Sequence, residues 1–65
     1  MRVLVNGNSR EIGAADLGAA LEELGYGGAV VATAVNGEFG PAAERRAARL
    51  ADGDRIEVLA PMQGG

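Results

Sequence analysis

Residues 16–25 read DLGAALEELG, and this stretch decides the class of fold. Its apolar residues recur at i, i+3, i+4 and i+7, which is one stripe of an α-helix: Leu17, Ala20, Leu21 and Leu24. Asp16 is a good N-cap, because its carboxylate can accept a hydrogen bond from an N–H group of the first turn. Gly25 is placed to adopt the left-handed conformation that ends a helix. The stretch therefore predicts one amphipathic helix that packs on a core.

Two strand-forming segments precede this helix. Residues 2–5 are rich in β-forming side chains, and residues 9–12 are a weaker strand candidate. Between them lies Asn6-Gly7-Asn8, and Asn-Gly tolerates the positive φ angles of a tight hairpin turn. The N-terminal segment therefore predicts a β-hairpin that leads into the helix.

Strand and turn signals also follow the helix. The glycine-rich residues 25–28 have no lysine and follow a helix, so they predict a connection and not a phosphate-binding loop. Residues 29–35 form an apolar run of strand length, typical of a strand in a covered sheet. Asn36-Gly37 repeats the hairpin turn chemistry and leads to residues 38–40.

The last third of the chain ends in a further strand. Residues 41–50 begin with a proline and have helix-forming composition, which leaves a short helix or an irregular turn open. Residues 51–54 predict a turn, and residues 55–59 predict a strand. Alternation in this strand places Ile56 and Val58 on one face and Glu57 and Leu59 on the other.

The order strand, strand, helix, strand, irregular region, strand predicts an α+β domain with the helix across one face of the sheet. The expected core brings the helix leucines onto the strands: Leu17, Leu21 and Leu24 against Val3, Val5, Val31, Ile56 and Val58.

Composition excludes several classes of function. The 65 residues contain no Cys and no His, and the formal net charge is −3 with all six basic residues being Arg. A nucleic-acid partner is disfavoured, because phosphate binding needs clustered positive charge. We interpret the basic cluster of Arg45, Arg46 and Arg49 beside Glu44 as a solvated face. No signal peptide or membrane-spanning stretch is present, so we expect a cytoplasmic protein without a membrane partner.

Independent catalysis is not supported by the body of the chain. Ser9 has no His partner for a nucleophilic triad. Glu22 and Glu23 are neighbours on a helix and do not face each other. Asp52 and Asp54 flank a glycine and predict a turn, because a calcium loop needs more oxygen ligands. We therefore expect no metal site, no bound cofactor and no enzyme activity.

The chain ends in Pro61-Met62-Gln63-Gly64-Gly65, which is poor material for a fold. Pro61 donates no N–H and should stop sheet pairing. Two glycines form a thin end that can enter a slot too narrow for a Cβ atom. The carboxylate of Gly65 reacts with nucleophiles only after activation, for example as an acyl-adenylate, and a partner enzyme would have to supply the ATP site.

These features resemble the ThiS family, the small sulfur carriers of thiamine biosynthesis, over essentially the whole length. The matching residues are Ala34-Val35-Asn36-Gly37, Pro41, Leu50, Asp52-Gly53-Asp54-Arg55-Ile56-Glu57 and Gln63-Gly64-Gly65. The resemblance implies the β-grasp (ubiquitin-like) fold, with a mixed sheet of four or five strands and one main helix across one face. It further implies a domain at 1–60 and a flexible C-terminal Gly-Gly tail at 61–65.

The resemblance also implies partners and site residues. An E1-like enzyme that uses ATP would adenylate Gly65, a sulfur donor such as a cysteine desulfurase would convert it to a thiocarboxylate, and thiazole synthase would take the sulfur. Gly64 would let the tail thread into these enzymes. Leu59 matches an apolar position that faces partners, although burial in a second core would explain it equally well. Met62 would guide the tail into a pocket or simply be exposed.

One segment departs from the family pattern, and three other functions stay open. Residues 41–45 lack the Arg and the Trp that many family members carry after the proline. The carrier could serve molybdopterin or cysteine synthesis, although the short chain favours thiamine. It could also be a ubiquitin-like modifier attached to lysines of other proteins, or a plain β-grasp interaction module.

Overall fold

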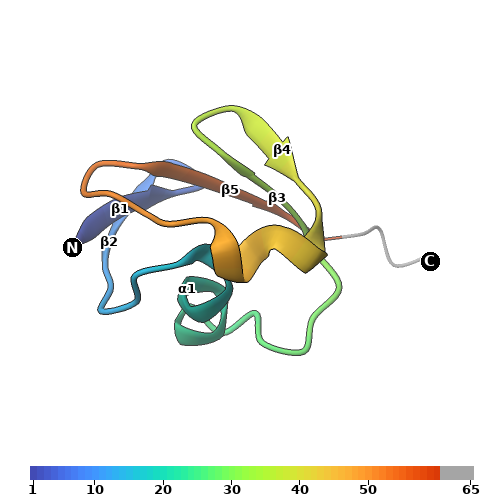
Figure 1. Cartoon of the computed structure of the whole chain (residues 1–65). Coiled ribbons are helices and arrows are strands. Elements are labelled where there is room, and N and C mark those ends of the chain that lie inside the picture. Colours follow the sequence, from blue (N-terminus) through green and yellow to red (C-terminus); the bar gives the residue numbers. More distant parts are fainter. Residues whose placement is uncertain (61–65) are drawn as a thin grey trace.

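The computed structural model describes residues 1–60, and the tail predicted at 61–65 lies outside them. Five strands form one mixed sheet in the order β2-β1-β5-β3-β4 (Figure 1). Its elements are β1 (Arg2–Val5), β2 (Asn8–Glu11), α1 (Leu17–Glu23), β3 (Ala32–Val35), β4 (Glu38–Gly40), the 3-10 helix η1 (Ala42–Ala47) and β5 (Arg55–Leu59). β1 and β5 are parallel, and the other neighbouring strands are antiparallel.

Both predicted Asn-Gly hairpins are confirmed. Asn6 and Gly7 have φ angles of 50° and 86°, and Asn36 and Gly37 have 53° and 84°. These positive angles belong to turns whose twist matches the twist of the flanking strands. The predicted second strand is shifted by one residue, because β2 begins at Asn8.

The predicted helix is confirmed with its caps. The carboxylate of Asp16 accepts a hydrogen bond from the N–H group of Ala19 at 2.7 Å. Gly25 follows the last turn with a φ angle of 97°. Leu17, Ala20 and Leu21 are buried, and Leu24 is packed at the edge of the core. Within residues 1–60, no helix is long and apolar enough to cross a membrane.

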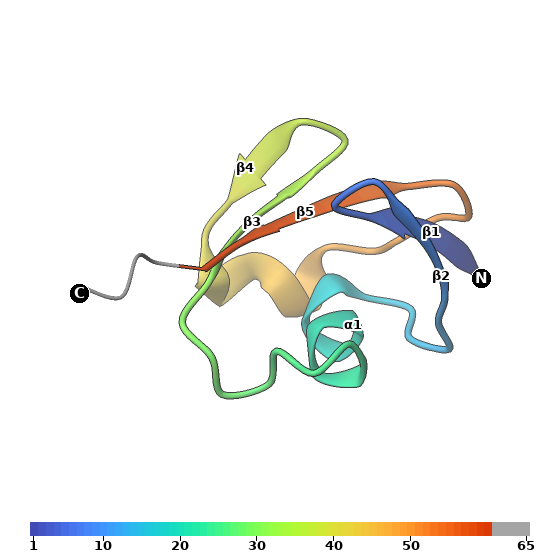
Figure 2. The ribbon, with the colours of Figure 1, turned by 180° about the vertical axis from the view of Figure 1, so that it is seen from behind.

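The core lies between α1 and one face of the sheet, as Figures 1 and 2 show. It contains the predicted strand residues Val3, Val5, Ile56 and Val58, and Val31 is partly buried beside them. Since α1 and η1 lie on the same side of the sheet, the other face has no covering element among residues 1–60. This asymmetry decides which residues of each strand are exposed.

The strand predicted at 29–35 is wrong in its first half. β3 begins only at Ala32, and Val30 is 80% exposed. A turn delays the strand, because Gly28 has a φ angle of 84° and the N–H group of Ala29 donates to the carbonyl of Tyr26 at 2.9 Å. The sheet is also covered on one face only, so the apolar run does not mark a strand buried on both sides.

The two readings of residues 41–50 resolve in favour of a short helix, the 3-10 helix η1. The N–H group of Glu44 donates to the carbonyl of Pro41 at 3.0 Å in its first turn. The segment that follows it is tied to the start of α1, because Leu17 N donates to Ala48 O and Leu50 N donates to Ala15 O, each at 2.9 Å. η1 is therefore a fixed part of the fold.

Candidate functional site

The end of β5 is the point from which residues 61–65 continue. β5 lies in the middle of the sheet, between β1 and β3. Figures 1 and 2 show that it ends beside the segment that enters β3 and close to the start of η1. Because β5 is a central strand, both β1 and β3 form backbone hydrogen bonds with it.

Both Asn-Gly turns bind β5 through their asparagine side chains. Asn6 Oδ1 accepts from the N–H group of Val58 at 2.8 Å, and Asn6 Nδ2 donates to the carbonyl of Val58 at 3.2 Å. Asn36 Oδ1 accepts from the N–H group of Arg55 at 3.0 Å. Sequence reasoning found the turns and missed these contacts. The recurrence of Val-Asn-Gly was the available signal.

The predicted alternation in β5 is confirmed. Ile56 is 0% exposed and Val58 is 6% exposed, whereas Leu59 is 70% exposed on the opposite face. The apolar character of Leu59 is therefore not explained by burial in a second core. Its contact with a partner stays a prediction.

Leu59 lies on the open sheet face, where apolar side chains surround Glu57, which pairs with Ala34. Leu59 pairs with Ala32 of β3, and the next outward residue of β3, Ala34, pairs with Phe39 of β4. Phe39 is also 70% exposed. We call Ala32, Ala34, Phe39 and Leu59 the outer patch, and it ends where the described chain leaves the sheet.

The interpretation of the basic cluster as a solvated face is wrong for Arg45. The guanidinium of Arg45 is half-buried and donates to the carbonyl of Val31 at 2.6 Å and to Thr33 Oγ1 at 3.3 Å. Arg46 is exposed and pairs with Glu22 of α1 at 2.6 Å. Neighbouring arginines thus connect η1 to two different elements.

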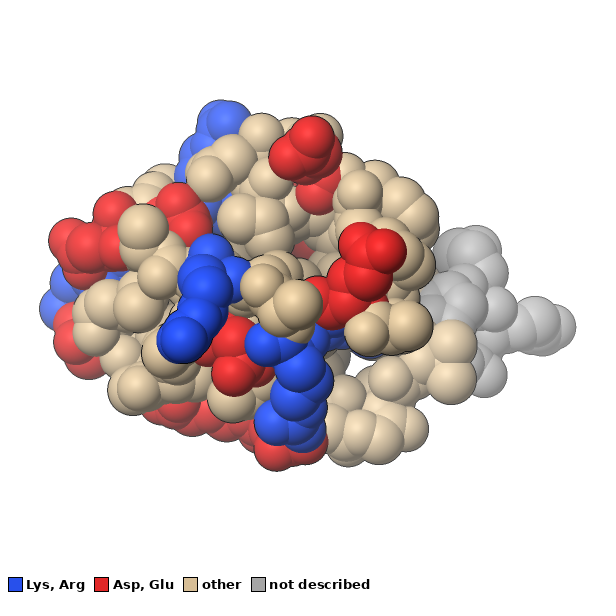
Figure 3. Space-filling view, in the orientation of Figure 1, with Lys and Arg blue, Asp and Glu red and all other residues tan. Residues whose placement is uncertain are grey.

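A groove of about 490 Å³ lies between the β3–β4 hairpin and η1. Leu17 and Val35 are among its apolar lining residues, and Glu38, Glu44 and Arg45 are its charged ones. Figure 3 shows acidic side chains on this side of the molecule. Phe39 of the outer patch also lines this groove, so the two surfaces meet at β4.

Comparison with protein families shows a match of the ThiS family profile to residues 3–65. The chain belongs to the ThiS family. It is similar over its whole length to the solved structure of the thiamine biosynthesis protein ThiS from Geobacter metallireducens. The two sequences are 33% identical, the match covers 100% of each chain, and the TM-score is 0.80. Curated protein sequences give no match.

The mixed five-stranded sheet with α1 across one face is the β-grasp fold of the ThiS family, as the resemblance implied. The ThiS profile also covers residues 41–45, so the missing Arg and Trp do not interrupt the match. Met62, Gly64 and Gly65 lie inside the profile match and outside the described residues. Their roles stay predictions.

The two aspartates before β5 are turn residues in this ThiS-family chain, as predicted. Asn36 Nδ2 donates to Asp54 at 3.0 Å, and the N–H group of Ala51 donates to it at 2.8 Å. Both bonds favour the charged carboxylate and hold the pKa of Asp54 below its ordinary value of 3.8. Asp52 accepts from the N–H group of Arg2 at 2.7 Å.

In residues 1–60, no group of three or more His, Cys, Asp or Glu could hold a metal ion.

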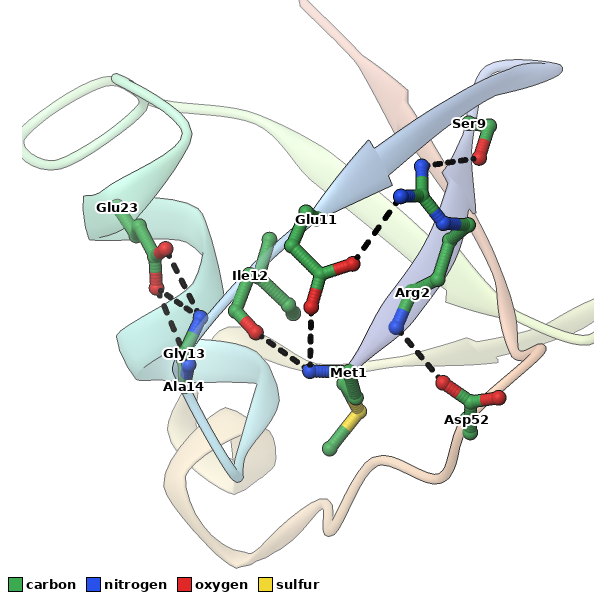
Figure 4. A network of polar contacts seen from close by, with 9 residues as sticks. All are labelled: Met1, Arg2, Ser9, Glu11, Ile12, Gly13, Ala14, Glu23 and Asp52. Carbon is green, nitrogen blue, oxygen red and sulfur yellow. Dashed lines mark hydrogen bonds and ion pairs between the residues drawn. The ribbon is translucent and has the colours of Figure 1, made fainter.

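A polar network anchors the N-terminal hairpin at the end of the molecule far from Leu59 (Figure 4). The amino group of Met1 donates to the carbonyl of Ile12 at 2.8 Å and pairs with Glu11 at 3.2 Å. The carboxylate of Glu23 accepts from the N–H groups of Gly13 and Ala14, at 2.9 and 3.1 Å. The Met1 contacts close the hairpin, and the Glu23 contacts hold the segment after it to α1.

Proposed function

We propose that this chain is a sulfur carrier of thiamine biosynthesis. The observation that carries the proposal is the ThiS family match, which extends through residue 65 and includes Gly64 and Gly65. It is supported by the likeness to the Geobacter metallireducens ThiS protein over the whole chain. In this proposal residues 1–60 are the domain that the partner enzymes bind, and residues 61–65 are the tail that enters their active sites.

The chemistry takes place at Gly65. An oxygen of its carboxylate attacks the α-phosphate of ATP in an E1-like enzyme, which releases pyrophosphate and leaves an acyl-adenylate. The outer sulfur of a persulfide on a donor such as a cysteine desulfurase then displaces AMP and forms an acyl disulfide. A thiol reductant cleaves the S–S bond, which leaves the terminus as a thiocarboxylate. Thiazole synthase takes this sulfur. The carrier itself contributes a reactive terminus and the surface by which each enzyme positions it.

The structure supports this division of roles through β5. Asn6 binds Val58 near the end of the strand and Asn36 binds Arg55 at its beginning, so the strand that leads to the tail is held at both ends. Gly65 is the fifth residue after Ala60, and an extended chain spans at most about 3.5 Å per residue. The activating enzyme must therefore approach the end of β5, where Leu59 is exposed.

Intact mass spectrometry tests the proposal. After incubation with ATP, a competent E1-like enzyme, a sulfur donor and a thiol reductant, we expect one oxygen of the chain to be replaced by sulfur. Omission of ATP should prevent the change. Transfer of the sulfur to thiazole synthase, and not to a molybdopterin or cysteine synthase, would establish the thiamine pathway. An unchanged mass with a competent enzyme would overturn the proposal, and Gly65 linked to lysines of other proteins would favour a modifier.

A further inference from the structure

Val30 is an apolar side chain that the fold leaves in solvent. It is 80% exposed, although the β-forming run around it predicts burial. It precedes Ala32, and Ala32 pairs with Leu59. Figures 1 and 2 both show the segment that enters β3 beside the end of β5. Val30 and Leu59 therefore lie at the same end of the sheet, where the tail begins.

Arg45 holds this segment in place. Its guanidinium donates to the carbonyl of Val31 and to the hydroxyl of Thr33, which is 2% exposed. These two residues flank Ala32. The segment lies between a glycine-rich turn, closed by the bond from Ala29 N–H to the carbonyl of Tyr26, and the pairing of Ala32 with Leu59. Glycines such as Gly27 and Gly28 have many accessible conformations, so the side-chain contacts of Arg45 add a restraint at this point. A planar guanidinium that binds two acceptors loses little freedom when it restricts the segment.

We propose that Arg45 is a positioning residue for tail activation. It holds the entry to β3 so that Val30 and Leu59 form one contact surface at the start of the tail, and an apolar surface around the tail channel of the activating enzyme binds there. This inference rests on the proposed function. The short span from Ala60 to Gly65 brings the enzyme close to this surface, and neither Val30 nor Leu59 offers a polar side-chain group.

Arg46 provides the matched control. It is the next residue of η1 and carries the same charge, but it pairs with Glu22 of α1 and not with β3. Arg45→Met removes the donors and keeps most of the aliphatic stem, and Arg46→Met removes the same charge. Arg45→Lys keeps one charged donor and should restore part of the effect.

Steady-state kinetics of adenylation, followed by pyrophosphate release while the carrier concentration is varied, measure the effect. For Arg45→Met we expect KM for the carrier to rise about tenfold with kcat unchanged, the pattern of lost uniform binding. Arg46→Met should keep KM within about twofold of the wild-type value. Circular dichroism and thermal unfolding of each variant confirm that it is folded at the assay temperature.

A double-mutant cycle separates positioning from a merely structural role. Val30→Ser alone should raise KM about as much as Arg45→Met. If Arg45 acts through Val30, adding Arg45→Met to Val30→Ser should change KM by less than about twofold. Additive effects, a fall in kcat alone, or an unchanged KM in Val30→Ser would overturn the inference, and the last result decides even if Arg45→Met does not fold. Failure of the wild-type chain to be adenylated would instead overturn the proposed function.

Discussion

The side-chain amide of Asn6 makes a pair of hydrogen bonds with the backbone of Val58, 52 residues further along the chain. It accepts from the N–H group and donates to the carbonyl, as the backbone of a neighbouring strand would. β1 ends at Val5 and its chain turns away at Asn6, so the amide extends the parallel pairing of β1 and β5 by one step. One residue thus makes the hairpin turn and supports the strand that leads to the tail.

Replacement of this amide should destabilise the domain. Asn6→Gly keeps the positive φ angle accessible and removes both hydrogen bonds to Val58. We expect the free energy of unfolding to fall by about 1–3 kcal/mol, because two backbone groups lose their partner. Urea denaturation measures the change. Asn8→Gly changes an exposed asparagine of β2 in the same hairpin. An equal loss in Asn8→Gly would show that the effect comes from glycine and not from the lost amide.

Adjacent residues of β5 should respond in opposite ways. Val58→Ala should lower the free energy of unfolding by about 2 kcal/mol, since Val58 is buried in the core. Leu59→Ser should change it by less than about 0.5 kcal/mol, because the side chain is exposed. In the adenylation assay Leu59→Ser should raise KM for the carrier. A stable Leu59→Ser variant with wild-type KM would exclude Leu59 from the enzyme contact.

Asp54 should make the domain less stable in acid. Its pKa is lowered by the amide of Asn36 and then by the N–H group of Ala51. The unfolded chain therefore binds a proton at a higher pH than the folded domain. The contribution of Asp54 is fully present above about pH 4, the unfolded pKa, and is lost as pH falls through the lower folded pKa.

NMR titration of the Asp54 carboxylate checks this prediction. In Asn36→Gly, which keeps the turn angle accessible and removes the principal donor, the pKa of Asp54 should move back toward 3.8. Asp54→Asn should show a weaker dependence of unfolding free energy on pH below about pH 4 than the wild type. Identical pH dependence of the two proteins would contradict the assignment.

Glu23 should stabilise the junction between the hairpin and α1. Its carboxylate accepts from the N–H groups of Gly13 and Ala14, and both groups lie in the segment that joins β2 to the helix. Glu23→Ala should cost about 1–2 kcal/mol in thermal or urea unfolding, as expected for hydrogen bonds to a charged group near the surface. Glu22→Ala removes an exposed ion pair with Arg46 and should cost less than about 0.5 kcal/mol. The reverse order of the two variants would be evidence against this role.

Removal of Gly65 should separate function from folding. The core is made by residues 1–60, so the free energy of unfolding should change by less than about 0.5 kcal/mol. Adenylation should be abolished, because the carboxylate of Gly64 would lie one residue short of the reacting position. Gln63→Ala, which keeps both glycines, should still be adenylated. Adenylation of the shortened chain at the wild-type rate would show that the last position is not the reacting one.

Local patterns in the sequence were sufficient to predict the helix at 16–25, both Asn-Gly turns and the strand at 55–59. Each depends on residues that are neighbours in the chain: a side chain that caps the next turn, a turn residue that tolerates positive φ, or alternating apolar residues. The same alternation predicted that Leu59 faces away from Ile56 and Val58. The ThiS resemblance supplied the β-grasp topology, which local patterns do not determine.

Only the tertiary structure decided where β3 begins, that Val30 is exposed, and that Arg45 and Asn6 bind distant backbone groups. The apolar run around Val30 has the composition of a buried strand, but burial depends on whether another layer covers it, and α1 covers only one face. Arg45 is a surface residue by its type, and the acceptors near it come from β3. Composition and spacing specify which contacts a residue is able to make, and the folded chain selects among them by bringing distant acceptors within hydrogen-bonding distance.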